Sequence, residues 1–197
     1  MPRSKPIPPP LDGRRVRSHN SRGRIVKAML ELVGRGSISP RAEEVAARAG
    51  VALRTVFRHF DDMDTLYREM AEEMLRQIRP MLEIPFNDSG WPARLFAMIE
   101  RRSRIFETAM PFKNAADVHR HRSAFLQKDY ATLRRMERVA LESALPDAIR
   151  GDRVRFDALN LLLSFDTWQR LREQQKITAA QARKTIEFAA RTLISGS

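Results

Sequence analysis

Lys and Arg side chains, which can bind phosphate groups, are concentrated in the first third of this chain. Residues 1–60 contain 13 Lys and Arg against 4 Asp and Glu, whereas residues 61–197 contain 23 against 20. A strongly basic module beside a nearly balanced remainder is typical of proteins that bind a polyanion such as nucleic acid. A generic solvated surface is the alternative interpretation.

A second group of candidate residues, Asp117, His119 and His121, contains the ligand types of a metal site. Residues two positions apart on a helix point to opposite sides, so the two histidines cannot share one ion there. The chain has no Cys, which excludes a disulfide framework and a thiolate nucleophile or metal ligand. The sequence also has no nucleotide-binding glycine loop and no Ser/His/Asp arrangement of recognisable spacing. We therefore expect no metal, no cofactor and no enzymatic activity.

Three short helical patterns before residue 61 can position the basic residues. The first is an apolar stripe with helical spacing over residues 21–33. The second starts at Ser39-Pro40, a capping hydroxyl followed by a proline at the first helical position, and ends near residue 48. The third covers residues 52–60.

Gly50, between the second and third patterns, supplies the positive φ that a tight turn requires. Ala46 is small enough for the two helices to cross closely, and Val56 and Phe60 carry the apolar stripe that packs the third helix onto the others. This spacing predicts a helix-turn-helix. An ordinary pair of antiparallel helices would show the same small residues, and the basic bias favours DNA binding over that alternative.

Residues 42–67, AEEVAARAGVALRTVFRHFDDMDTLY, closely resemble the DNA-binding domain of the TetR family of transcription regulators. The matching positions are Val45-Ala46, Ala49-Gly50-Val51, Thr55-Val56-Phe57, His59-Phe60 and Leu66. Three positions depart from the family pattern. Ala52 replaces a capping Ser or Thr, and Phe57 and Met63 replace a Tyr and a Lys that bind phosphates in the family. Arg41, Arg54 and Arg58 are candidate replacements for those contacts.

The resemblance implies that the third helix lies in the major groove of DNA. Thr55 would bind a phosphate or touch a thymine methyl group, and His59 would approach the DNA backbone. Arg54 could read the O6/N7 edge of guanine or bind only phosphate, and Arg58 could be a solvated charge. The residues expected to contact DNA are Arg41, Ala52, Leu53, Arg54, Thr55, Phe57, Arg58 and His59.

The whole chain is predicted to be all-α, with about nine helices, because no stretch alternates with period two for long enough to form a strand. Residues 1–20, rich in proline and arginine, should form an extended basic arm. Residues 21–66 should form the DNA-binding domain, and 67–197 a helical effector-binding and dimerisation domain. The last two helices are expected at 152–174 and 178–195.

Family resemblance further implies a homodimer, in which the last two helices pair with those of a second copy. Core packing is the alternative for Trp168. The expected interface residues are Leu162, Phe165, Trp168, Ile186, Ala190 and Leu193. Methionines and aromatic residues gather between the two regions and could line an effector pocket, although such residues also fill ordinary cores. The candidate pocket residues are Met70, Met74, Met98, Phe106, Met110, Phe125 and Tyr130.

The chain contains no apolar run of the length that spans a bilayer, and a cysteine-free composition suits a reducing cytoplasm. We therefore expect a cytoplasmic regulator, a repressor that a small apolar or amphipathic ligand releases from a palindromic double-stranded DNA operator. The alternative is a DNA-binding protein without a small-molecule effector, either nucleoid-associated or controlled by a partner.

Overall fold

The computed structural model describes residues 13–60, 63–86 and 90–195, and every regular element in this part of the chain is helical. This confirms the predicted all-α fold. The elements are α1 Gly13–Gly34, α2 Ala42–Ala49, α3 Leu53–His59, α4 Met63–Leu82, α5 Trp91–Arg120, α6 Ala124–Ala144, α7 Asp147–Gly151, α8 Arg153–Leu162, α9 Phe165–Gln169, the π-helix η1 Arg170–Gln174 and α10 Ala179–Ser195.

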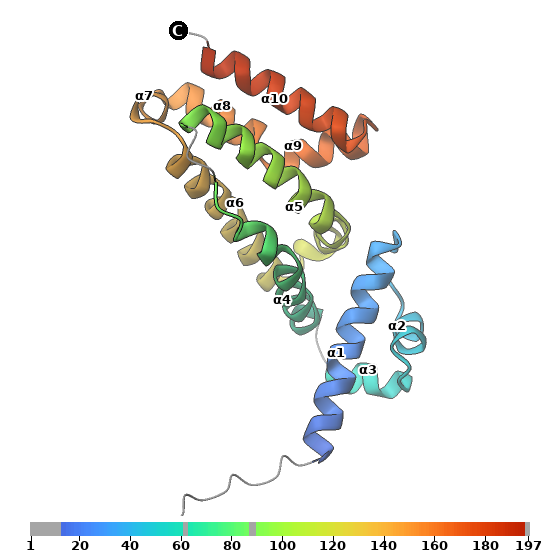
Figure 1. Ribbon diagram of the computed structural model, residues 1–197. Helices are drawn as coiled ribbons and strands as arrows, with labels where there is room; N and C mark the ends of the chain where they lie inside the picture. Colours follow the sequence, from blue (N-terminus) through green and yellow to red (C-terminus); the bar gives the residue numbers. More distant parts are fainter. Residues whose placement is uncertain (1–12, 61–62, 87–89, 196–197) are drawn as a thin grey trace, which may run out of the picture.

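The helices form a small N-terminal head and a longer bundle (Figure 1). α1, α2 and α3 lie together at one end of the molecule, and α10 lies at the opposite end. α4 leads from the head into the bundle, where α5 and α6 run beside it. The three helices expected to meet DNA are therefore held at one end of a helical body.

Two hydrophobic cores stabilise these parts. The first joins α1–α4 to the end of α5 and the start of α6, and contains Ile25, Val56, Tyr67 and Phe112. The second lies among α5–α10 and is centred on residues such as Trp168. Because Phe112 packs with the head residues, the head shares a core with the bundle. A boundary drawn at residue 66 therefore divides a packed unit.

Two helix boundaries differ from the sequence-based expectation. α1 begins at Gly13, so the predicted extended arm is wrong for residues 13–20, while residues 1–12 lie outside the described part. The run of prolines ends at Pro10, so no proline stops a helix from Gly13 onward. α2 begins at Ala42, a little after the predicted start at Ser39-Pro40.

The helix predicted over 152–174 is interrupted between Leu162 and Phe165, and a short α7 precedes it. Ser164 causes the restart, because its side chain accepts a hydrogen bond from the backbone N–H of Thr167 at 3.2 Å, as an N-cap does. Ser164 Oγ also donates to the carbonyl of Leu161 at 2.7 Å. These local bonds compete with the helical ladder and change its direction.

Candidate nucleic-acid interface

The turn between α2 and α3 has the geometry that the sequence predicted. Gly50 adopts φ 60° and ψ 44°, in the left-handed region, and its N–H donates to the carbonyl of Ala47 at 3.2 Å. Ala46 and Val56 are buried, as expected for residues that hold two crossing helices together. Phe60 is also buried, which confirms its predicted place in the core.

Arg24 on α1 stabilises this turn by a hydrogen bond, a contact that the sequence did not predict. Its Nη2 donates to the Gly50 carbonyl at 3.0 Å. A Cβ placed on Gly50 would lie 2.6 Å from the same Nη2. The signal for this contact is absent from local sequence, because it joins residues 26 positions apart.

α3 presents one exposed side. Leu53, Arg54, Phe57 and Arg58 are exposed, and Phe57 retains 57% of its accessible surface. These residues fall at i, i+1, i+4 and i+5, which places them on one face of a helix. An exposed phenylalanine beside two arginines on a short helix is a surface suited to contact with another molecule.

The N-terminal ends of α2 and α3 differ in how they are capped. Ala52 precedes α3 in extended conformation without a side-chain cap, as the substitution of the family's hydroxyl implied. Thr55 is half-buried, and its backbone N–H donates to the Ala52 carbonyl at 2.8 Å. At the N-terminus of α2, the backbone N–H of Arg41 donates to Glu44 Oε2 at 2.8 Å. The Arg41 residue itself is exposed.

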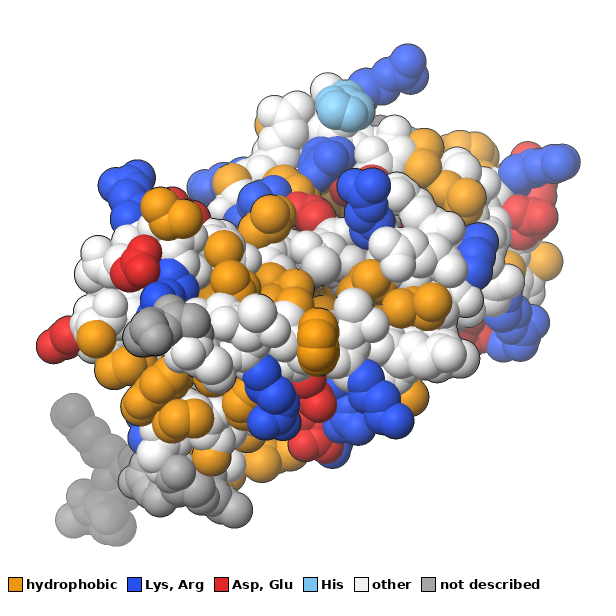
Figure 2. Space-filling view, turned by 90° about the horizontal axis from the view of Figure 1, so that it is seen from above, with side chains coloured by type: hydrophobic (Ala, Val, Ile, Leu, Met, Phe, Trp, Pro, Cys, Tyr) orange, Lys and Arg blue, Asp and Glu red, His pale blue; other side chains and the backbone are white. Residues whose placement is uncertain are grey.

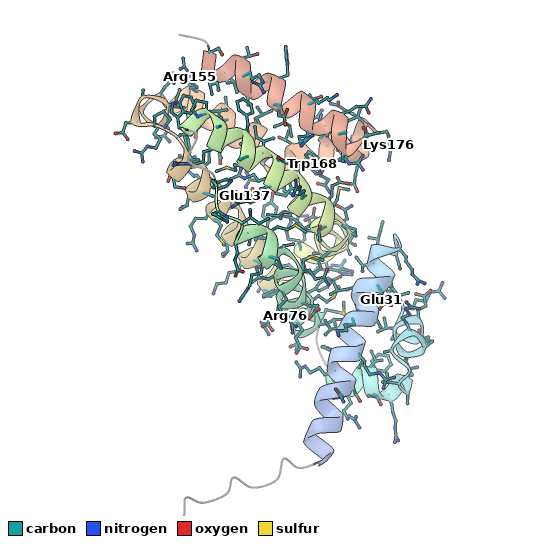
Figure 3. The ribbon with its side chains drawn as sticks, viewed as in Figure 1. Glu31, Arg76, Glu137, Arg155, Trp168 and Lys176 are labelled. Carbon is teal, nitrogen blue, oxygen red and sulfur yellow. The ribbon has the colours of Figure 1, made fainter. Side chains whose placement is uncertain are left out.

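The arginines of the head fall into two groups. Arg22 binds Glu69 of α4, and Arg48 binds Glu31 of α1, so both hold helices together; Glu31 is labelled in Figure 3, on the side of α1 that faces α2. In the described part of the chain, no carboxylate lies within 4.0 Å of the guanidinium groups of Arg41, Arg54 or Arg58. Arg41, Arg54 and Arg58, which the sequence placed against DNA, are therefore among the head arginines without an ion pair in the described residues.

His59 differs from the expectation that it approaches the DNA backbone. Its side chain is half-buried, and its Nε2 is buried without a hydrogen-bond partner in the described residues. Burial, and then the positive charges of Arg58 and Arg22, lower the pKa of this imidazole below 6.5. The Nε2 of this ring therefore faces the protein rather than the solvent.

The predicted effector-pocket residues do not line one cavity. Met70 is buried in the first core and Met98 and Phe106 in the second, so these three side chains fill packing space. The remaining candidates divide in the same way: Met74 and Phe125 pack against the first core, Met110 packs against the second, and Tyr130 donates from its hydroxyl to Asp166 at 3.0 Å.

The expected interface residues also divide. Phe165, Trp168, Ile186 and Ala190 are buried within the single chain, so their assignment to a dimer interface is wrong. Trp168, seen between α5 and α9 in Figure 3, is 1% exposed and donates from Nε1 to Glu107 at 2.8 Å, which makes it a core residue. The only predicted interface residues left partly accessible are Leu162 and Leu193.

Other apolar residues occupy the outer side of the same helices. Val154 and Leu161 on α8 are 82% and 65% exposed, and Phe188 on α10 is 74% exposed. Figure 2 looks onto the α10 side of the molecule and shows hydrophobic side chains between basic ones. Val154 and Leu161 are seven residues apart and share one face, a signal that the sequence contained.

The fold resembles that of a transcriptional regulator from Rhodococcus sp. Rha1, known from its crystal structure. The TM-score is 0.64 at 17% sequence identity, over 91% of this chain and 96% of that chain. No protein-family model and no curated protein sequence matches the chain. Among the helices that the structure describes, none combines the length and the apolar character needed to cross a membrane.

Proposed function

We propose that the chain is a TetR-like transcription regulator that binds double-stranded DNA through α3. The observation that carries this proposal is the exposed face of α3, where Arg54 and Arg58 have no ion-pair partner in the described residues. Uncompensated arginines on a short helix after a glycine turn suit phosphate and base-edge contacts in a major groove. The fold similarity to a transcriptional regulator supports the same role.

The proposed assembly is a homodimer formed by the outer faces of α8 and α10. Val154, Leu161 and Phe188 supply an apolar surface there, with the partly accessible Leu162 and Leu193 beside it. Large exposed apolar side chains on adjacent helices are typical of protein interfaces. Two copies related by a two-fold axis would present two α3 helices to half-sites about 34 Å apart.

In this proposal the chain acts in the cytoplasm as a repressor, without catalysis, and a small apolar or amphipathic ligand in the α4–α10 bundle releases it from DNA. The shared first core supports such coupling, because Phe112, Ala115 and Leu126 of the bundle pack with residues of α1 and α4. A regulator without a small-molecule effector is the second candidate. The dense packing of Met70, Met98 and Phe106 favours that candidate.

Titration of fluorescent DNA fragments from the chain's own genomic neighbourhood, read by anisotropy at fixed salt, tests DNA binding. The double variant Arg54→Ala/Arg58→Ala should lose most of the affinity, because two charge-assisted contacts are removed from each half-site. Arg104→Ala, an exposed arginine on α5, is the matched control and should bind as the wild type does. Equal affinities for all three proteins would contradict the proposal.

A further inference from the structure

Phe57 on α3 is an exposed aromatic residue that the rest of the chain leaves uncovered. More than half of its surface is accessible. In the part of the chain that the structure describes, no other aromatic ring packs against the Phe57 ring and no Lys or Arg lies over it. Arg54 and Arg58, on the same helix, also leave the ring uncovered.

The other phenylalanines show how this chain covers such a ring when it lies near the surface. Arg101 lies 3.7 Å from the centroid of the Phe86 ring, and Arg191 lies 4.2 Å from that of Phe96. Among the described phenylalanines, all but Phe57 and Phe188 pack against another ring or lie under an Arg or Lys. Phe188 lies in the proposed dimer interface, so an uncovered ring in this chain indicates a surface that another molecule covers.

The exposed side of α3 has a basic centre and an apolar flank. Successive residues of an α-helix are turned by about 100°. Because Val56 faces the core, Arg54 and Arg58 lie on the outermost side of the helix. Leu53 and Phe57, four residues apart, lie next to each other on one flank of these arginines.

Thr55, which the sequence placed against a phosphate or a thymine methyl group, lies on the other flank. It is two residues from Phe57, or about 200° around the helix, and it is half-buried. The two flanks therefore face different parts of any molecule that lies against α3. Phe57 and Leu53 present much more apolar surface to such a molecule than the single methyl group of Thr55 does.

Contacts with the rest of the head hold the apolar flank in place. α3 packs on α1 and α2, and the buried Val56 accepts a backbone hydrogen bond from the buried Phe60 at 3.1 Å. At the other end of α3, the turn at Gly50 is tied to Arg24. Since the helix is already fixed, contact through Phe57 requires little further ordering of the backbone.

The chemistry of this face identifies the group that can cover it. α3 contains no Asp or Glu, so its two arginines attract a polyanion. Leu53 and Phe57 need an apolar group on the same polyanion. The base edges in the major groove of DNA carry hydrogen-bond donors and acceptors, and the C5-methyl group of thymine is their apolar feature.

We propose that Phe57, together with Leu53, reads the C5-methyl group of a thymine in each half-site of the operator, beside the base pair that Arg54 faces. A tyrosine at this position binds a phosphate in the family that the sequence resembles, and Phe57 has no hydroxyl group for that bond. The ring therefore serves sequence recognition here. This inference rests on the proposed function, in which α3 binds double-stranded DNA.

Replacement of thymine by deoxyuridine, which lacks only the C5-methyl group, tests the contact. The probe is a duplex selected from random DNA by the wild-type protein, and thymine should be enriched at one symmetric pair of its positions. Deoxyuridine at this pair should weaken binding about tenfold in anisotropy titrations at fixed salt, because each buried methyl contributes roughly a factor of four. Cytosine at the same pair should bind more weakly than 5-methylcytosine by a similar factor.

Two variants assign the effect to the side chain. Phe57→Ala should bind the thymine and deoxyuridine duplexes equally well, because the group that contacts the methyl is gone. Its melting temperature should stay within about 2 °C of the wild type, since the ring is exposed. Met136→Ala removes an apolar side chain of similar exposure, 56%, from α6 and should keep the full preference for thymine.

The outcomes separate this inference from the proposed function. A wild-type protein that binds its selected duplex, with deoxyuridine tolerated at every position, would refute the thymine contact and leave DNA binding intact. A Phe57→Ala protein that retains the full preference for thymine would do the same. A wild-type protein that selects no duplex would refute both, and the uncovered ring would then belong to a contact with another protein.

Discussion

Gly50→Ala is the perturbation whose cost can be worked out most directly from the structure. The backbone at Gly50 has φ 60°, where an alanine is disfavoured by about 1–2 kcal/mol. The new Cβ would meet Arg24 Nη2 at 2.6 Å, so the guanidinium must move away from the Gly50 carbonyl. Loss of that exposed hydrogen bond costs about 0.5–1 kcal/mol more, which gives a loss in unfolding free energy of about 1.5–3 kcal/mol.

Two other glycines separate these contributions. Gly36 has φ 95° with no atom within 4 Å of an added Cβ, so Gly36→Ala reports the backbone term alone, about 1–2 kcal/mol. Gly23 lies inside α1 with the same open space, and Gly23→Ala should stabilise the protein by about 0.5–1 kcal/mol.

Urea unfolding followed by circular dichroism measures all three changes, with Arg24→Gln/Gly50→Ala as a double variant. When Arg24 is already replaced by Gln, Gly50→Ala should lower the unfolding free energy only by the contribution of the left-handed backbone, about 1–2 kcal/mol. A Gly50→Ala protein as stable as Gly23→Ala would refute the argument. Equal losses for Gly50→Ala and Gly36→Ala would show that the Arg24 bond contributes nothing.

Arg54→Ala should reduce the preference for guanine at one symmetric pair of operator positions and leave non-specific affinity nearly unchanged, whereas Arg41→Ala should weaken binding to every sequence. Titration of operators with single-base changes measures both effects. If Arg54 binds only phosphate, Arg54→Ala will lower the affinity for all of these operators by the same factor, as Arg41→Ala does. Leu161→Glu/Phe188→Glu should halve the mass seen by light scattering at micromolar protein, because charges replace the apolar face of α8 and α10, and a persisting dimer would exclude that interface. The unfolding free energy should fall as pH drops below 6.5, because His59 is protonated more readily in the unfolded chain than in the folded one. His59→Gln should reduce this fall. Identical dependence of the unfolding free energy on pH in the wild type and the variant would argue against a buried imidazole.

The head was predictable because its constraints are local. Gly50 is needed by a turn that only a few residues make, and Ala46 and Val56 are small or branched residues at short, fixed distances from it. The exposure of Arg54 and Arg58 follows from the same register, since burial of Val56 turns these neighbours outward. The partial burial of His59 was not predicted, because it depends on contacts from other helices.

The bundle shows what only tertiary structure decides. α8–α10 carry apolar residues on more than one side, so periodicity could not tell the inner Trp168 and Ile186 from the outer Leu161 and Phe188. That choice depends on where α5 lies, and α5 is distant in sequence. The burial of Lys113 and Glu137 likewise depends on the packing of α5 against α6, and it lowers the pKa of the lysine and raises that of the glutamate.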